Sequence, residues 1–395
     1  MRTVEEHQKV VAELIKARAP QDVPLNDTLG LALAADVVAP LSLPGFDNSA
    51  MDGYAVVADD VAGATEDAPV RLPVAEDIPA GRTDPLTLRP GTAHRIMTGA
   101  PLPSGATAVV PVEATDGATD TVTIRAAARG GQHIRRAGED VTAGTTVLRA
   151  GQVISPAALG LAAALGLATL PVLPPQRVMV MSTGTELVAP GTELQPGQIY
   201  ESNAVMLAAA VRDAGAQATI APMSADDVDA FRAALAAHAV DADLIITTGG
   251  VSAGAYEVVK DSLSDQVEFV KVAMQPGMPQ GAGMVDGVPI VTLPGNPVSA
   301  LVSFEVFVRA PLRTAMGLAE PDRPRRTAQL TEDLTSPRGK RQFRRGVLTG
   351  DSVSSYGPPA SHHLRWLASA NCLLEIAEDI TELTAGSTVP VWDLS

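Results

Sequence analysis

The chain has 395 residues, 46% apolar and 19% charged, a balance that excludes a single small module, a disordered chain and a collagen-like repeat. Its 45 acidic and 29 basic residues give a formal net charge of −16, which repels phosphate backbones and disfavours general nucleic-acid binding. The single cysteine, Cys372, excludes a disulfide framework and a multi-cysteine metal site and is typical of a cytoplasmic protein.

The first residues predict a helix and no targeting signal. Apolar side chains recur at helical spacing between Val4 and Ile15, and Glu5 and Glu6 stand where a secretory signal carries basic residues. The longest apolar stretch, Ala157 to Leu173, follows a Ser-Pro pair typical of a helix start and contains two glycines and a proline. It predicts a buried helix of a soluble protein, so we expect no insertion into a membrane.

Changes in the sequence pattern divide the chain into four parts. Short β-prone runs separated by Gly, Pro and Asp turns predict a β insertion domain at 44–131. The flanking segments, 1–43 and 132–174, are expected to form one discontinuous linker domain around it. Residues 175–318 predict an α/β domain, and alternating residues predict a final small β domain at 319–395.

Within the predicted α/β domain, continuous apolar runs alternate with helical patterns. The runs at 178–181, 244–246 and 289–293 are typical of strands buried on both faces of a parallel sheet. The helices that would cover this sheet are expected at about 203–214, 226–238 and 297–310.

Each of these strands runs into a turn of small residues followed by a helix. In open α/β sheets, ligands lie beyond the carboxyl ends of the strands, where glycine amides and helix N-termini favour anions. One such turn is weak evidence, because many strand-to-helix connections need a glycine for steric reasons alone; three turns in register predict a site for a phosphate-bearing ligand. The residues expected to bind it are Thr183, Gly184, Gly249, Gly250, Ser252, Pro294, Gly295, Asn296, Pro297 and Ser299.

Acidic residues near these turns predict a divalent cation. Carboxylates and phosphates repel unless a cation lies between them, and Mg²⁺ is commonly held by one or two carboxylates together with substrate phosphates. The candidate Mg²⁺ ligands are Glu186, Asp226 and Glu257. Asp226 fits a helix N-cap equally well, because it lies in the string Ser-Ala-Asp-Asp before an amphipathic run.

Three strings outside the α/β domain combine polar residues with tight turns. The string at 44–55 would present Asp47, Asn48, Ser49 and Asp52 to a ligand, or form an elaborate turn with Asx hydrogen bonds. Arg-Ile-Met-Thr-Gly-Ala-Pro at 95–101 is similarly dense. Arg-Arg-Ala-Gly-Glu-Asp at 135–140 suits either an oxyanion clamp or an ion-pair cluster. Composition does not separate these alternatives.

Taken together, the strings at six positions resemble the MoeA family of molybdopterin molybdenumtransferases, which includes the homologous region of gephyrin. The resemblance follows the whole chain in order. Its strings are PGFDNSAMDGYA at 44–55, RIMTGAP at 95–101, RRAGED at 135–140, STGTEL at 182–187, TGGVS at 248–252 and LPGNPVSA at 293–300.

The resemblance implies an elongated homodimer of four-domain subunits, each with a molybdopterin-binding α/β domain and a C-terminal small β barrel. It implies insertion of molybdate into adenylylated molybdopterin with Mg²⁺-dependent release of AMP, at a site shared between subunits. By motif position, the insertion side contributes Asp52, Thr98 and Asp140. The crevice side contributes Glu186, Asp226, Pro294 and Pro297, and Glu257 is a further catalytic candidate.

Two departures from the family pattern concern charge. Gln275 and Met278 stand where many members carry lysines that would attract molybdate, and Glu257 stands where an aspartate is frequent. One methylene moves a carboxylate by about 1.5 Å, a change that metal geometry tolerates. Lys260, Lys271 and Arg345 are candidates to compensate for the missing lysines, or are solvated surface charges.

Two other functions remain as alternatives. A gephyrin-like scaffold would hold the acidic tail of a receptor or of a tubulin-like division protein between the α/β and C-terminal domains, with or without catalysis. A local basic excess suits such a tail, or a solvent-facing surface; it comprises Arg323, Arg325, Arg326, Arg338, Lys340, Arg341, Arg344 and Arg345. A molybdopterin adenylyltransferase would not require the strings at 44–55 and 95–101.

Overall fold

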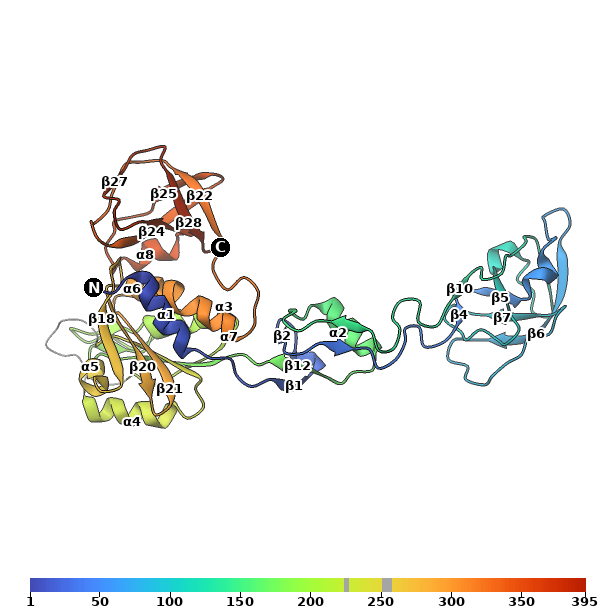
Figure 1. The fold of residues 1–395 in the computed structure, drawn as a ribbon, viewed down its shortest axis with the longest axis horizontal. Coiled ribbons are helices and arrows are strands. Elements are labelled where there is room, and N and C mark those ends of the chain that lie inside the picture. The colour runs from blue at the N-terminus through green and yellow to red at the C-terminus, as the bar shows by residue number, and fades with distance from the viewer. Residues whose placement is uncertain (224–226, 251–257) are drawn as a thin grey trace.

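The protein is an elongated chain of four units in this computed structural model, which describes residues 1–223, 227–250 and 258–395. An α/β unit and a C-terminal barrel lie at one end, a small central unit follows, and a β unit lies at the other end (Figure 1). This confirms the predicted multidomain architecture. No helix in the described part of the chain is long and apolar enough to cross a membrane.

The α/β unit is built on a six-stranded mixed sheet. The strand order is β16 (Gln217–Ile220), β13 (Arg177–Ser182), β17 (Leu244–Thr248), β21 (Val288–Leu293), β20 (Pro279–Val285) and β18 (Val267–Lys271). The first four strands are parallel and the last two run antiparallel to their neighbours. The predicted parallel strands are therefore present, extended at one edge by an antiparallel pair.

Helices cover both faces of this sheet, because alternate residues of each buried strand face opposite sides. Val178 and Val180 face a core that includes side chains of α1, α3 and α6, whereas Met179 and Met181 face α4 and α5. The helices are α1 (Val4–Leu14), α3 (Asn203–Asp213), α4 (Val228–His238), α5 (Val258–Leu263), α6 (Pro297–Ser303), a π-helical segment (Phe304–Val308) and α7 (Arg309–Ala315).

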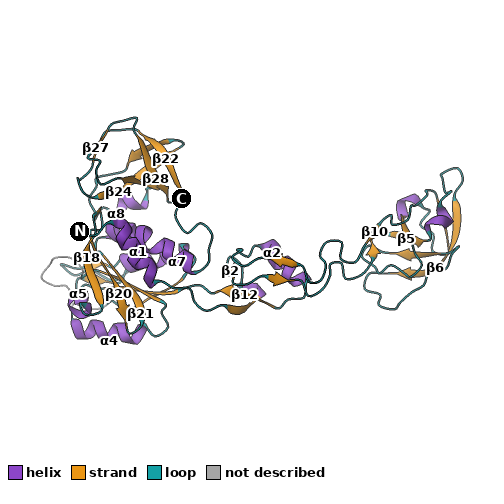
Figure 2. Ribbon diagram, in the orientation of Figure 1, coloured by secondary structure: helices purple, strands orange, loops and turns teal. Residues whose placement is uncertain are grey.

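The first helix lies on the α/β unit and not in the central unit. Helix α1 begins with a capping box between Thr3 and Glu6, and its Val4 and Val11 belong to the core beneath the sheet. Figure 2 shows α1 beside α7, away from the central strands. Proximity in sequence to residues 21–43 therefore does not decide where this helix packs.

The central unit contains two small sheets and a helix. Strands β1 (Gln21–Pro24), β12 (Thr169–Leu173) and β2 (Ala32–Leu33) form one sheet, and β3 (Val37–Val38) pairs with β11 (Thr146–Leu148). The single helix expected over Ala157–Leu173 is wrong in its second half. Helix α2 (Pro156–Ala164) ends before Gly166, whose φ of +75° leaves the helical region, and the chain continues as β12.

The β unit at the far end is a five-stranded sheet. Its order is β8 (Ala108–Pro111), β5 (Gly53–Val56), β7 (Ala93–Ile96), β6 (Val70–Ile78) and β9 (Thr121–Ile124). A shorter pair, β4 (Asn48–Ser49) with β10 (Ile134–Arg135), joins two of the dense sequence strings. A side chain at Gly53 would overlap the carbonyl group of Val110, so the close packing of β5 on β8 requires glycine there.

The C-terminal unit is a closed five-stranded barrel. The strands around the ring are β24 (Arg341–Thr349), β25 (Ser352–Ser355), β22 (Arg325–Leu330), β28 (Thr388–Asp393) and β26 (Cys372–Ile376), and β26 pairs with β24 to close it. Helix α8 (Leu364–Ala368) and the pair β23 (Leu334–Thr335) and β27 (Glu382–Leu383) lie outside the ring. Strand β19 (Met274–Gln275) pairs with β24 and joins the barrel to the α/β unit.

Candidate functional site

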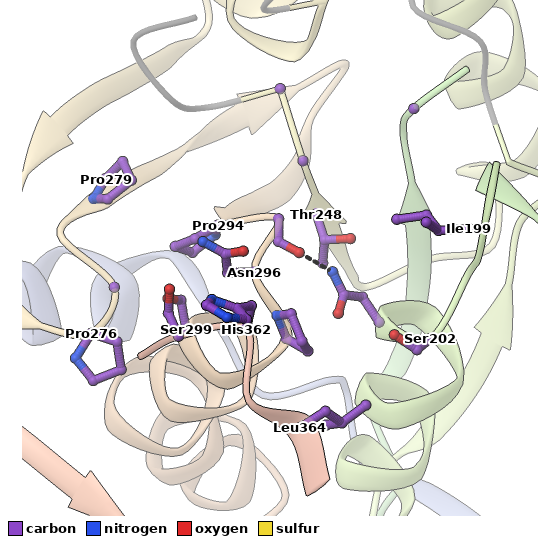
Figure 3. A pocket seen from close by; sticks show the side chains of 18 of the residues that line it. Ile199, Ser202, Thr248, Pro276, Pro279, Pro294, Asn296, Ser299, His362 and Leu364 are labelled. Carbon is purple, nitrogen blue, oxygen red and sulfur yellow. Dashed lines mark hydrogen bonds between the residues drawn. The ribbon is translucent and has the colours of Figure 1, made fainter. Parts of the chain in front are cut away.

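A large cleft opens where the parallel strands of the α/β unit end. Its volume is ≈ 1250 Å³, and the turns after β13, β17 and β21 line it together with a loop of the barrel. Figure 3 shows Pro294, Asn296 and Ser299 inside this cleft, with Ile199 and Ser202 toward one side and Pro276 and Pro279 toward the other. Nine of the ten predicted ligand-binding residues line the cleft, all but Ser252, which lies outside the described residues.

Close contacts between the three glycine turns bring their backbones together. Gly249 has a φ of +90°, and a Cβ there would lie 2.7 Å from the carbonyl oxygen of Thr183. A Cβ on Gly295 would lie 3.4 Å from the Cα of Gly249. The hydroxyl of Thr183 donates to the carbonyl of Thr248 at 3.3 Å and ties the first turn to the second. The floor of the cleft is therefore mostly backbone, a surface to which an anion can approach closely.

Among the described residues, two carboxylates line the cleft, and their surroundings differ. The carboxylate of Glu186 folds back over its own turn, so that a Cβ on Gly184 would lie 2.7 Å from its Oε2. Glu201 is buried, and its Oε1 accepts hydrogen bonds from the hydroxyl of Ser182 at 2.8 Å and from the amide of Ala204 at 2.7 Å. Glu201 therefore connects the end of β13 to the start of α3.

The other two predicted metal ligands, Asp226 and Glu257, lie outside the described residues. Within the residues that are described, no group of three or more His, Cys, Asp and Glu side chains could hold a metal ion. Glu186 alone fits the type of site in which one or two carboxylates and substrate phosphates share Mg²⁺, since such a site needs no full protein cage.

A second polar cluster lies in the β unit, at the other end of the elongated molecule (Figure 1). The Oδ1 of Asp52 accepts hydrogen bonds from the backbone amide of Thr98 at 2.6 Å and from its hydroxyl at 2.7 Å. These bonds favour the ionised carboxylate and lower the pKa of Asp52. Asp47 accepts from the amide of Ala137 and pairs with Arg136 at 2.5 Å. The strings at 44–55, 95–101 and 135–140 thus meet in space.

Asp140 lies at the exit from this cluster. Its side chain is exposed, and its backbone amide donates to the carbonyl of Leu43 at 3.1 Å. The structure therefore brings Asp52 and Thr98 into contact, and it places them at the opposite end of the subunit from the cleft (Figure 1).

Comparison with known proteins identifies the family. Models described as "MoeA N-terminal region (domain I and II)", "Probable molybdopterin binding domain" and "MoeA C-terminal region (domain IV)" match residues 2–166, 179–314 and 327–394. Molybdopterin molybdenumtransferase 2 of Mycobacterium tuberculosis H37Rv is 69% identical over 405 residues, covering 100% of both chains. The chain belongs to the MoeA family.

Other similar proteins agree over the full length. Molybdopterin molybdenumtransferase 1 of M. tuberculosis H37Rv is 38% identical and covers 99% of this chain and 98% of its own. A crystal structure of the molybdopterin biosynthesis MoeA protein of Pyrococcus horikoshii superposes with a TM-score of 0.84 at 29% identity, covering 100% of this chain and 99% of that one. The elongated arrangement of units is thus common to this MoeA-family chain and a solved MoeA structure.

A loop of the C-terminal barrel forms one wall of the cleft in this MoeA-family chain. Lys340 and residues 359–362 line it, and His362 lies beside the α6 turn in Figure 3. Arg345 holds this loop in place. Its guanidinium is buried and donates to the carbonyls of Ala360 at 3.3 Å, of His363 at 3.0 Å and of Pro358. Burial lowers the pKa of Arg345.

These contacts change the expected distribution of positive charge. Arg345 anchors the loop and is absent from the lining of the cleft. Gln275 and Met278 do line the cleft, as does Lys340, whereas Lys271 is absent from its lining. Lys340 has no ion pair among the described residues, so it is the cation that the barrel side adds to the cleft. The sequence placed it only within a general basic stretch.

Half of that basic stretch, four of its eight residues, forms ion pairs with nearby acids. Arg323 pairs with Glu305 at 2.9 Å, Arg341 with Glu378 at 2.9 Å, and Arg326 with Asp393 at 3.7 Å. Arg325 lies over the ring of Trp392, with its Cζ 4.2 Å from the ring centroid, and Arg344 donates to Ser355. The barrel surface therefore offers less free positive charge than its sequence indicates.

Sequence reasoning missed part of the wall next to α3. Asn203 donates from Nδ2 to the carbonyl of Gly295 at 2.7 Å, and its Oδ1 is buried without a partner among the described residues. Glu201 lies two residues before it. The only signal for both was the polar string Tyr-Glu-Ser-Asn at the start of a predicted helix.

Proposed function

We propose that this MoeA-family chain is a molybdopterin molybdenumtransferase that inserts molybdate into adenylylated molybdopterin and releases AMP. The full-length identity of 69% to a protein of that name carries the proposal. A cleft of ≈ 1250 Å³ floored by three glycine turns supports it, because such a surface suits the pyrophosphate of the adenylylated ligand.

The backbone of the glycine turns would hold the pyrophosphate, and Lys340 would add positive charge from the barrel side. Asn203, with its unpartnered Oδ1, would accept a hydrogen bond from the ligand. Thr183, Pro294 and Ser299 would line the bound molecule. Because the protein as a whole is strongly acidic, this local arrangement of donors determines where an anionic ligand binds.

Glu186 would hold Mg²⁺, with Asp226 and Glu257 as the further candidate ligands. When bound, Mg²⁺ would neutralise the negative charge that develops on the phosphates during cleavage. Molybdate is a substrate in this scheme, and Gln275 and Met278 would offer it fewer charges than the lysines common in the family. Lys340 partly compensates for that difference.

We propose further that the active site is shared between two copies of the chain. In one subunit the Asp52–Thr98 pair and the cleft lie at opposite ends, which supports a site completed by the second copy of a homodimer. Asp52, Thr98 and Asp140 of that copy would then face Glu186. The ionised carboxylate of Asp52, fixed by Thr98, would orient the attacking oxygen of water or molybdate.

The assay is AMP release from adenylylated molybdopterin with Mg²⁺ and molybdate. Asp52→Ala and Glu186→Ala are each expected to abolish release. Co-expression of the two variants tests the shared site, since a mixed dimer contains one cleft and one insertion loop that are both intact. Random mixing should restore about one quarter of the wild-type activity. No recovery from mixed dimers would contradict the shared site, and no AMP release by the wild type would contradict the function.

The scaffold alternative is not favoured, because the full-length relatives are molybdenumtransferases and half of the candidate charges for an acidic receptor or tubulin-like tail already form ion pairs. An adenylyltransferase alone is disfavoured by the full-length match to molybdenumtransferases. We propose a cytoplasmic location for the enzyme. The only cysteine, Cys372, is free and buried, which is consistent with a reducing compartment.

A further inference from the structure

A second, smaller hollow borders the cleft. Its volume is ≈ 420 Å³, within the range of pockets for small organic ligands, which begins at about 300 Å³. It shares Tyr200, Glu201 and Ser202 with the cleft and is otherwise lined by Pro190, Gly191, Val205 and Met206. This lining is mostly apolar, unlike the backbone floor of the cleft. The two spaces therefore adjoin each other but suit different chemical groups.

Tyr200 presents a fixed aromatic ring to this hollow. The side chain is 44% exposed, although its hydroxyl is held by a 2.8 Å hydrogen bond to the carbonyl of Thr192. The backbone is held as well, because β14 (Leu187–Val188) pairs with β15 (Ile199–Tyr200) and the amides on both sides of Tyr200 donate at 2.9 Å. An exposed ring that loses little freedom on binding is a ready platform for stacking.

Two neighbours complete the hollow. Val205 is 52% exposed on the first turn of α3, and Met206 offers a polarisable thioether beside it. Ser202 is the N-cap residue of α3, but its hydroxyl makes no capping hydrogen bond. The hollow thus combines an aromatic ring, two apolar side chains and one hydroxyl that can donate or accept. Such a set suits a flat heterocycle with polar edges.

We propose that this hollow binds the adenine ring of the adenylylated ligand, stacked on Tyr200. The proposal rests on the proposed function, because it assigns one part of that ligand. The phosphates would lie over the glycine turns, and the base would extend past Ser202 into the hollow. Figure 3 shows Ile199 and Ser202, which flank Tyr200, on the side of the cleft away from Pro276 and Pro279. The pterin would therefore occupy the proline side.

The test measures binding of AMP to the full-length protein by calorimetric titration. Tyr200→Ala removes the platform and should weaken AMP binding by about 5- to 150-fold, the range for loss of one stacked base. Val205→Trp fills the hollow from the opposite wall and should also weaken binding. Tyr200→Phe keeps the ring without its anchor and should lie between wild type and Tyr200→Ala. Met284→Ala, an apolar side chain of similar exposure (41%) on β20, is the matched control.

Saturation-transfer NMR provides a second measurement. The adenine protons of AMP should receive magnetisation from the wild-type protein and lose it in Tyr200→Ala, whose folding is checked by circular dichroism. Unchanged AMP affinity in Tyr200→Ala and Val205→Trp would overturn the assignment, as would an absence of AMP binding by the wild type. A change in dimer dissociation without a change in AMP binding would make the hollow a subunit contact, and would overturn it too.

The results also separate this inference from the proposed function. Normal AMP release by wild type combined with Tyr200-independent AMP binding would leave the function standing and remove the adenine site. Tyr200-dependent AMP binding without any AMP release would keep the adenine site and contradict the proposed function.

Discussion

One buried histidine is expected to make the α/β unit sensitive to mild acid. His7, on α1, is fully buried and packs edge-on against Phe307, with ring centroids 4.7 Å apart. Neither ring nitrogen has a hydrogen-bond partner among the described residues. Burial and, to a smaller extent, the charge of Arg2 lower the pKa of His7 from 6.5 to about 4, against an opposing effect of Glu268.

The pH range of the effect follows from these two pKa values. Above pH 6.5, His7 is neutral in both the folded and the unfolded chain. Below it, the unfolded chain binds a proton that the folded chain accepts only near pH 4, so stability is lost as the pH falls between these values. At about pH 5, protonation favours the unfolded chain by a factor of about 30, or about 2 kcal/mol.

The perturbation is His7→Phe, which keeps a ring against Phe307 and removes the titration. Urea unfolding followed by far-UV circular dichroism reports mainly the α/β unit, because α1 and α3 to α7 belong to it. Between about pH 7.5 and about pH 5 the wild type should lose about 2 kcal/mol more stability than His7→Phe. His238→Gln, exposed at the end of α4, should behave as the wild type. Equal losses in wild type and His7→Phe would refute the reasoning.

Three further predictions concern the cleft and the second cluster. Gly249→Ala should lower AMP release by about tenfold or more, because the added Cβ would lie 2.7 Å from the carbonyl oxygen of Thr183. The control is Gly197→Ala, which has a similar φ and open space around it and should leave AMP release unchanged. Arg345→Met should speed amide hydrogen exchange at residues 360–363 and reduce AMP release while the barrel stays folded, because three loop carbonyls lose their donor. Normal exchange in this variant would contradict the anchoring role. Thr98→Val should raise the pKa of Asp52 in a carboxylate NMR titration. The pKa of Asp47, whose carboxylate is bound by Ala137 and Arg136, should not change. An unchanged pKa of Asp52 would show that the hydrogen bond from the Thr98 hydroxyl is unimportant.

Local patterns predicted the α/β unit well. Strands β13, β17 and β21 and helices α3 and α4 lie within two residues of their expected positions, because buried parallel strands and amphipathic helices have distinct periodicities. The stretch after Ala164 was harder, since Leu170 and Val172 are buried in a strand whose residues are as apolar as those of α2. Short apolar runs of this kind do not distinguish helix from strand.

The residues that line the cleft also divide into those that the sequence predicted and those that it did not. Its glycine turns were predictable because each directly follows a buried strand, and parallel strands end at one edge of the sheet. Three other lining residues were not predictable. Glu201 follows the short strand β15, Lys340 directly precedes the barrel strand β24, and His362 lies on the barrel loop that Arg345 holds. Their positions depend on contacts between residues far apart in the chain.

The amino-acid sequence alone determined the buried strands of the α/β unit, the glycine turns that follow them and the resemblance to the MoeA family, since each is a property of neighbouring residues. Only the tertiary structure decided that α1 packs on the α/β core, that Arg345 is spent on loop carbonyls and that Asp52 lies far from Glu186 in one subunit. Long-range packing and the position of the central unit between the two ends of the molecule (Figure 1) set these relations, and no local periodicity encodes them.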